Sequence, residues 1–223
     1  MKTKPIFLKL RIIAISSIMI WTSCTKGPNP NPPPPPAQPF YNIVADGLCK
    51  ITLVPGAVNH VDTIIGAGIV KIIGRTLYAA GAGAATVSIK ELDSLTTNGS
   101  SFVEATTTLN LNRIAITGNG LSKMDLKLAV TDSIAATCNG FGPYILSGNT
   151  SLLRLALHGA GAFKAFNLLS QDCYVTLLGA GVGEVYASNS LTAGIYGWGV
   201  VYYKGNPPIV SPTILGLGTL VKK

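Results

Sequence analysis

The sequence is poor in charged residues, and this scarcity limits the functions that it can support. Only 12% of its 223 residues are Asp, Glu, Lys or Arg, whereas 48% are hydrophobic. Four of the 17 basic residues, namely Lys2, Lys4, Lys9 and Arg11, lie in an N-terminal segment that we expect to be cleaved. The remaining 13 basic and nine acidic residues give a charge of +4 without any Lys/Arg cluster. We therefore expect no nucleic acid partner.

Histidines and closely spaced cysteines are also scarce, which argues against a metal centre. The two histidines, His60 and His158, have no evident partner in the sequence, and no CxxC spacing occurs. We interpret the cysteines beyond residue 24 as small core residues, because free cysteine is usually buried. They are Cys49, Cys138 and Cys173. The sequence therefore predicts neither a metal ion nor a cofactor.

The nine acidic residues are scattered along the chain, which argues against glycoside hydrolysis. That chemistry needs two carboxylates held close together. Asp125 and Asp132 could approach each other, and Glu91 and Asp93 are expected to share a strand face. Isolated surface carboxylates account for these residues more simply. We expect no catalytic residue and a protein that is not an enzyme.

The N-terminal apolar run is too short to be a permanent membrane-spanning helix. It covers Ile12 to Trp21, about half of the ~20 residues that such a helix needs, and follows a basic stretch. This order predicts a signal peptide over residues 1–23. The sequence Trp21-Thr22-Ser23-Cys24 resembles the lipobox of bacterial lipoproteins. The resemblance implies that Cys24 carries acyl chains such as palmitate. It also implies an outer membrane lipoprotein that faces the periplasm or the cell surface, with the membrane as one partner.

Residues 24–39 are rich in proline and are expected to form a lipid-anchored linker. Proline fixes φ and removes a backbone donor, so this stretch cannot join a sheet or a helix. It predicts an extended spacer of ~3.1 Å per residue that holds the folded part away from the membrane. The folded domain is expected to cover residues 40–223.

A pair of glycines returns about every nineteen residues in that domain. The first glycines of the pairs are Gly118, Gly140, Gly159, Gly179, Gly197 and Gly216, with fainter copies at Gly47, Gly66, Gly81 and Gly99. A fixed period in this range indicates a structural unit stacked on copies of itself. This favours an extended surface over a single catalytic cleft.

The residues before each pair alternate in polarity. Positions two and four before the first glycine are apolar, as in Leu155 and Leu157, whereas the position between them is small and mostly polar. This alternation predicts a half-buried strand, and the glycine pair predicts a corner at which φ becomes positive. Stacked coils of this kind form an all-β, single-stranded parallel β-helix, a β-solenoid of ~19-residue coils. We expect right-handed coiling from the usual chirality of parallel connections.

With these corners, the sequence resembles the head-GIN domain of the auto-transporter adhesin family. The resemblance rests on sGsG-like corners such as Leu157-His158-Gly159-Ala160-Gly161, on the opening strand Gly47 to Leu53, and on Tyr203-Lys204-Gly205-Asn206-Pro207. The last of these resembles the Y-x-G-x-P signature of the family. The resemblance covers about Asp46 to Lys223 and implies a parallel β-helix on a secreted or lipid-anchored protein. The family supplies no catalytic residues.

Aromatic residues in the second half of the domain suggest a ligand surface. Phe141 and Trp198 stand in the middle of their G-x-G corners, where we expect a large apolar side chain to be exposed. Such side chains could stack on the sugar rings of a glycan or anchor an envelope or host surface protein. Core filling is the alternative explanation for the aromatic residues as a set.

The sequence as a whole predicts a cell-envelope lipoprotein with a non-catalytic surface for adhesion or scaffolding. One alternative is a glycan-binding module or a degenerate carbohydrate-active protein. Another is a purely structural component of the envelope. Ligand identity and oligomeric state stay open.

Overall fold

The computed structural model describes residues 39–223, and these residues form an all-β domain. Its strands are β1 (Asn42–Pro55), β2 (His60–Gly66), β3 (Ile69–Ile73), β4 (Thr76–Ile89), β5 (Ser94–Thr97), β6 (Phe102–Gly118), β7 (Lys123–Cys138), β8 (Pro143–Leu157), β9 (Ala162–Leu177), β10 (Val182–Tyr186), β11 (Ser190–Ile195), β12 (Val200–Lys204), β13 (Ile209–Ile214) and β14 (Thr219–Lys222). Within the described part of the chain, no helix is long and apolar enough to cross a membrane. The expected signal peptide, Cys24 and nearly all of the expected linker lie outside the described residues.

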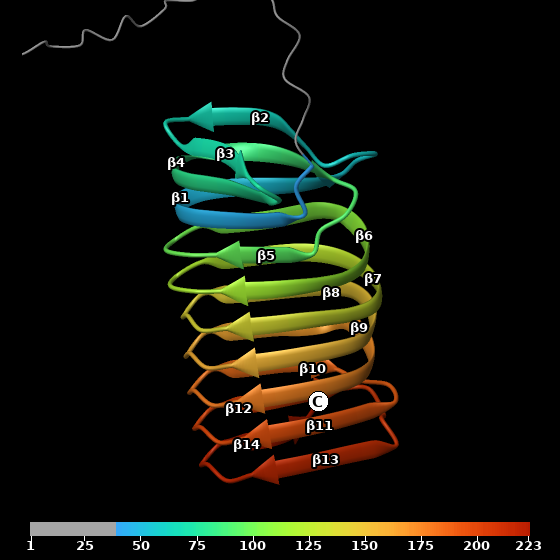
Figure 1. The fold of residues 1–223 in the computed structure, drawn as a ribbon. Coiled ribbons are helices and arrows are strands. Elements are labelled where there is room, and N and C mark those ends of the chain that lie inside the picture. Colours follow the sequence, from blue (N-terminus) through green and yellow to red (C-terminus); the bar gives the residue numbers. More distant parts are fainter. Residues whose placement is uncertain (1–38) are drawn as a thin grey trace, which may run out of the picture. The chain divides into compact units, whose positions relative to one another are not determined.

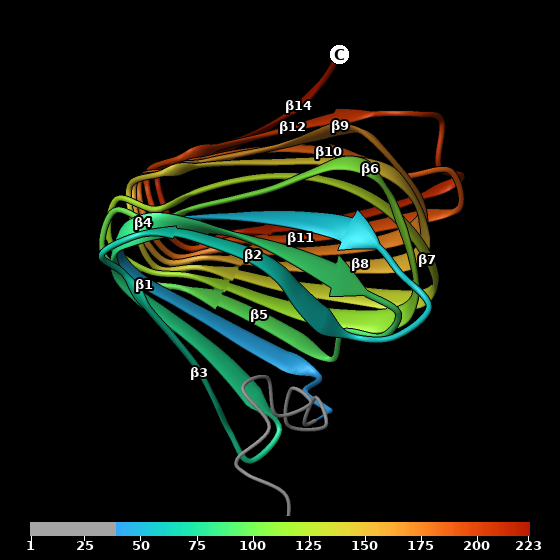
Figure 2. The same ribbon diagram turned by 90° about the horizontal axis from the view of Figure 1, so that it is seen from above.

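The strands wind into a parallel solenoid with two walls and a core between them (Figures 1 and 2). Each of β6 to β9 contributes to both walls. In the later coils the two walls are built by separate strands, because β10 and β12 stack in one wall and β11 and β13 in the other. Seen from the β1 end, the coils run clockwise as they recede (Figure 2), so the solenoid is right-handed. The predicted β-solenoid is confirmed.

The alternation before each glycine pair places one side chain inward and the next one outward. Leu155 and Leu157 are buried, whereas Ala156 between them is partly exposed. Parallel register then stacks like positions from coil to coil. One interior row is Leu95, Ile116, Ala136, Leu155, Val175 and Ala193. These rows form the core, and parallel pairing between coils about 4.8 Å apart makes it continuous.

The corners need glycine because successive coils approach each other closely there. Backbone hydrogen bonds continue through the bend, as from Phe141 N to Gly120 O (2.8 Å) and from Trp198 N to Gly179 O (3.0 Å). A Cβ atom built on Gly140 or Gly179 would come within 3.0 Å of a backbone oxygen in the preceding coil. Gly99 and Gly120 have positive φ, but no corner glycine from Gly140 onward does. The expectation that φ is positive at every corner is therefore wrong, and the close approach of the backbones explains the glycines.

The register also corrects the alignment of the pair Gly118–Gly120. Gly118 pairs with Cys138, so it belongs to an interior row, and Gly120 is the residue that stacks under Gly140. A side chain at Gly118 would collide with the ring of Tyr144, which is fully buried. The irregular 22-residue spacing after Gly118 therefore disappears, since the corner glycines are Gly99, Gly120, Gly140, Gly159, Gly179, Gly197 and Gly216.

The N-terminal end departs from simple stacking. β4 follows β1 in the sequence but lies on its outer side, so that β1 is inserted between β4 and β5 (Figure 1). β2 and β3 then pair with β4 in the antiparallel direction. Gly66 and Gly68 thus lie at the turn between β2 and β3 of an antiparallel cap, and not at the corner of a parallel coil. This cap covers the outer edge of β4.

The free edge of β13 is interrupted by proline. Leu215 N donates to Ile195 O of β11, and successive residues of a strand point to opposite sides. The nitrogen of Pro212 therefore lies at the free edge, where a missing donor discourages pairing with another strand.

The three cysteines in the described residues are free and buried, as the core interpretation predicted. Burial raises the pKa of the Cys138 thiol and of the Cys173 thiol to about 12. Burial also raises the pKa of Cys49, whose Sγ donates to Ala79 O (3.5 Å). Protonated thiols of this kind are poor nucleophiles and poor metal ligands.

Replacing Gly179 with alanine tests the close approach between coils. The added methyl group has to displace the backbone of the preceding coil, so we expect a loss of about 1–3 kcal/mol in the free energy of unfolding. Ala180→Ser is the matched control, because this neighbouring side chain is exposed and adds its atom to solvent. Denaturant unfolding should show a normal midpoint for Ala180→Ser. A Gly179→Ala protein as stable as the control would contradict the explanation.

Candidate binding surface

The seven stacked corners form one edge of the solenoid, which we call the glycine edge. It comprises residues 98–101, 119–122, 139–142, 158–161, 178–181, 196–199 and 215–218. None of these residues is Asp, Glu, Lys or Arg. Two rows of side chains project from the edge: the residue before the first glycine and the residue after it. The edge is thus an extended, uncharged surface whose side chains decide what it can contact.

The row after the first glycine carries large exposed hydrophobic residues. The exposed fraction is 67% for Phe141 and 75% for Trp198, so both side chains project into solvent as expected. They are three coils apart, because the corners of Ala160 and Ala180 lie between them. Leu121 and Leu217 occupy the same row and are also exposed. A role for Phe141 and Trp198 in ligand binding stays a prediction.

The row before the first glycine is polar in the N-terminal half of the edge. Asn119 Nδ2 donates to Asn98 Oδ1 (2.8 Å), and Asn139 Nδ2 donates to Asn119 Oδ1 (2.9 Å). His158 Nδ1 lies 2.9 Å from Asn139 Oδ1 and extends this amide ladder by one coil. The expectation that His158 has no partner is therefore wrong. Coil stacking brings these side chains together, although they are about twenty residues apart in the sequence.

The same row is apolar in the C-terminal half of the edge. Leu178, Tyr196 and Leu215 replace the amides, and Trp198 and Leu217 lie beside them in the other row. These five side chains are all exposed, with Leu215 at 77%. We call this set the apolar edge. The three leucines were not predicted as surface residues, and only their positions beside the glycines of the repeat could have indicated their exposure.

The aromatic residues divide between the core and the surface. Tyr144 and Phe163 are buried, so core filling explains these two. Tyr144 Oη lies 3.3 Å from Ser122 Oγ, and burial raises the pKa of the phenol. Tyr174, Tyr196 and Trp198 are exposed. Several others contribute to cation–π contacts on the walls, such as Tyr202, whose ring centroid lies 4.6 Å from Lys223 Nζ.

The carboxylates do not form the close pairs that were considered. Glu91 and Asp93 lie in the loop between β4 and β5, not on a strand face, and Asp93 pairs with Arg75 (3.8 Å). Asp125 and Asp132 are seven residues apart on β7. In residues 39–223, no group of three His, Cys, Asp or Glu side chains is arranged to hold a metal ion.

Two carboxylates have lowered pKa values for structural reasons. Lys50 Nζ lies 2.9 Å from Glu104 Oε1 and lowers the pKa of this carboxyl, as does the hydroxyl of Thr52. Hydrogen bonds from Ser190 and Asn189 lower the pKa of Asp172. Each carboxylate ties neighbouring coils together on a wall, so these shifts reflect coil pairing and not a reactive site.

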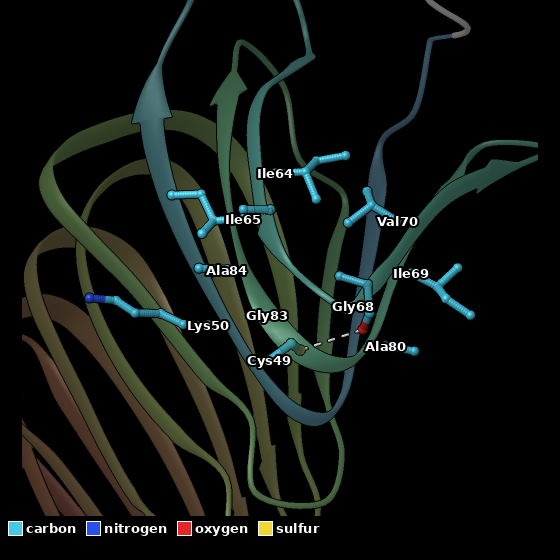
Figure 3. A pocket seen from close by; sticks show the side chains of 12 residues that line it. Cys49, Lys50, Ile64, Ile65, Gly68, Ile69, Val70, Ala80, Gly83 and Ala84 are labelled. Atoms are coloured by element: carbon cyan, nitrogen blue, oxygen red, sulfur yellow. Dashed lines mark hydrogen bonds between the residues drawn. The ribbon is translucent and has the colours of Figure 1, made fainter.

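The hollow beneath the N-terminal cap is small. Its volume is about 10 Å³, and its lining includes Cys49, Ile65 of β2 and Val70 of β3 (Figure 3). Such a volume holds one water molecule at most. An open groove of about 380 Å³ crosses β7, β8 and β9 near residues 131, 150 and 170. It is lined mainly by hydroxyl and amide side chains, including Thr131, Asn149 and Gln171.

These features define an all-β solenoid that presents extended surfaces. The chain belongs to the family described as "Putative auto-transporter adhesin, head GIN domain", whose model matches residues 49–207. No curated protein matches the chain. The matched region ends at the Y-x-G-x-P sequence, in which Gly205 has a φ of +93° and lies against Ala187 O. A family of this kind indicates a surface- or envelope-associated protein.

Solved structures of similar fold come from Bacteroides fragilis and Parabacteroides distasonis. A putative adhesin from Bacteroides fragilis superposes with a TM-score of 0.75 at 22% identity, over 83% of this chain and 93% of that chain. A putative adhesin from Parabacteroides distasonis gives 0.67 at 21% identity, with the same coverage. A protein from Parabacteroides distasonis described as a "putative lipid binding protein" gives 0.60 at 19% identity, again over 83% and 93%. At these identities the likeness establishes the fold.

Replacing Asn119 tests how much the amide ladder contributes to stability. Asn119→Ala removes the donor to Asn98 and the acceptor for Asn139, so we expect the free energy of unfolding to fall by about 1 kcal/mol. Leu121→Ala is the control, because that side chain is exposed on the same corner and should change stability by less than about 0.5 kcal/mol. Thermal or denaturant unfolding measures both. Equal stability of the two variants would show that the ladder contributes nothing.

Proposed function

We propose that this protein is a cell-envelope lipoprotein whose solenoid is a non-catalytic adhesive module. The observation that supports this proposal best is the apolar edge, a contiguous exposed patch in the coils at the end opposite to β1. Contiguous exposed apolar patches on a folded domain are typical of interaction sites. The adhesin-like family and the scattered carboxylates support the absence of catalysis.

The positions of the two ends suit an adhesive role. The described chain enters at β1, next to the cap, and the strand order runs from there to β14. An acyl chain on Cys24 would anchor the N-terminal side, so the apolar edge would lie in the coils farthest from the anchor. The proline-rich linker would add reach in this proposal. In this proposal the protein sits on the outer membrane and faces the periplasm or the cell surface.

The adhesive role predicts a loss of attachment when the apolar edge is made polar. Trp198→Ser combined with Leu217→Ser should lower attachment of cells to their target surface by about tenfold, because buried aromatic anchors dominate interface energies. Leu48→Ser combined with Leu121→Ser is the control, since both leucines are exposed and Leu48 follows Gly47, which stacks under Gly99 of the glycine edge. Adhesion counts on cells with equal amounts of each variant measure the effect.

Two further observations would contradict this proposal. Cys24→Ser should move the protein from the membrane fraction to the soluble fraction, and retention in the membrane would reject the lipid anchor. Protease treatment of intact cells distinguishes the cell surface from the periplasm. Attachment that is unchanged in the Trp198/Leu217 variant, with normal folding, would reject the apolar edge as the adhesive surface.

A glycan-binding module is the second candidate, and the open groove that crosses β7, β8 and β9 favours it. The groove crosses four coils and offers neutral hydroxyls and amides beside Tyr186, a lining that suits a polyhydroxylated ligand. Asn149→Ala combined with Tyr186→Ala should then abolish binding on a glycan array, whereas the Trp198/Leu217 variant should bind normally. An array without any bound glycan would remove this candidate.

A further inference from the structure

Two open grooves of the domain join into one long trough. One crosses β7, β8 and β9. The other has a volume of about 680 Å³ and is lined by residues 90–93, between β4 and β5, and by residues 110–113 of β6. They meet where β6 pairs with β7, because Thr131 Oγ1 of one groove donates to Asn112 Oδ1 of the other (2.9 Å). We call the joined grooves the polar trough, which comprises residues 90–93, 110–113, 130–131, 149–151, 169–171, 186 and 188.

The polar trough runs along the stack of coils. It crosses the loop between β4 and β5, then β6, β7, β8 and β9, and ends in the coil after β9. Backbone hydrogen bonds join its two ends to the stack, from Ala115 N to Asp93 O (2.9 Å) and from Ser188 N to Ser170 O (3.1 Å). The five steps between these six levels, at about 4.8 Å each, make the trough about 24 Å long. This length suits a linear polymer whose units repeat as the coils do.

The exposed side chains of the trough are mainly neutral amides and hydroxyls. The amides of Asn110, Asn149 and Gln171 are exposed, so their donors and acceptors can reach a ligand. Coil pairing also places one neutral polar residue from each successive level in a single row, which Asn189 continues beyond the trough. This row is Asn112, Thr131, Ser151, Gln171 and Asn189.

Two less polar side chains complete the lining toward the C-terminal end of the trough. The exposed fraction of Leu169 is 53%, and Tyr186 is partly exposed. A sugar ring has hydroxyl groups around its rim and apolar C–H groups on its faces. The amides and hydroxyls of the trough suit the rim, whereas Leu169 and the ring of Tyr186 suit a face.

An extended peptide fits the trough less well than a glycan chain. Peptides that lie along a sheet bind mainly through the free backbone groups of an edge strand. The backbone of the trough is already paired between levels, as from Asn189 N to Gln171 O (2.8 Å). Recognition at this surface therefore depends on side chains.

A polyanion also fits poorly, because it needs a row of basic residues. The part of the trough on β7, β8 and β9 is lined by no charged residue. Asp132 and Asp172 directly follow Thr131 and Gln171 in the chain and add negative charge beside the row. The charged residues at the other end of the trough carry both signs, and they are Lys90, Glu91, Asp93 and Arg113.

We propose that the polar trough binds a linear, neutral polysaccharide whose chain lies along the axis of the stack. A sugar in an extended chain advances about as far as one coil does, so about five sugars fill the trough. Amides and hydroxyls of successive levels bind the sugar hydroxyls, and Tyr186 stacks on a ring near one end. This inference rests on the glycan-binding candidate above and names its ligand class.

The test measures how affinity depends on the length of the ligand. The core lies within residues 39–223, so a chain that begins at Thr25 keeps the folded domain and excludes any acyl chain on Cys24. The probes are β-linked oligomers of glucose, mannose, xylose and N-acetylglucosamine, each from the disaccharide to the octasaccharide. Oligomers of galacturonic acid are the acidic counterpart. Isothermal titration calorimetry gives the affinities.

For at least one neutral series, we expect the affinity to rise with each added sugar up to about the pentasaccharide and then to level off. Asn110→Ala should lower the affinity for the hexasaccharide about fivefold, as the loss of one hydrogen bond does. It should leave the affinity for the disaccharide unchanged, because a disaccharide beside Tyr186 does not reach β6. Asn98→Ala is the matched control, since it removes an amide from the glycine edge, and should change either affinity less than about twofold.

Four results would overturn the trough as the site of a neutral polysaccharide. They are the absence of binding by every neutral series, equal affinities for the disaccharide and the hexasaccharide, tighter binding of the acidic oligomers, and equal affinities of the Asn110 and Asn98 variants for the hexasaccharide. Binding without length dependence would leave the glycan-binding candidate standing with a short site. Cell attachment that depends on Trp198 and Leu217 would keep the adhesive function in every case.

Discussion

The fold depends on one constraint, which is the continuity of the parallel hydrogen-bond ladder through the glycine corners. Each coil turns there without interrupting its pairing with the coil beneath, so the backbones come close enough to exclude a Cβ atom. Glycine is required by this approach and not, in most coils, by a left-handed φ. The same requirement leaves the residues on either side free to vary, since their side chains point outward.

This division of roles explains how one edge can be both structural and functional. The glycines are fixed by backbone contact, whereas the row before them holds amides in the first coils and large apolar groups in the last. The amide ladder satisfies its own hydrogen bonds and stabilises the stack. The apolar edge satisfies no partner within the described residues. Its exposure is therefore the strongest indication of where the molecule meets another surface.

The N-terminal end shows how the chain protects an edge that stacking alone would leave open. β2 and β3 reverse direction and cover β4, so the outermost strand on that side belongs to an antiparallel cap. At the other end, Pro212 interrupts the free edge of β13 and Lys222 adds charge to β14. Both devices discourage uncontrolled strand addition.

The sequence by itself determined the β-solenoid, the inward and outward positions of the later strands, and the exposure of Phe141 and Trp198. Each of these follows from local rules, namely strand alternation and the repeat period. The tertiary structure decided the true register of Gly118 and Gly120, the order of β1 and β4, and the antiparallel cap. It also decided the joining of Asn98, Asn119, Asn139 and His158 into one ladder. These features depend on which coil lies against which, and a contact between backbones twenty residues apart leaves no signal in the local pattern that would reveal it.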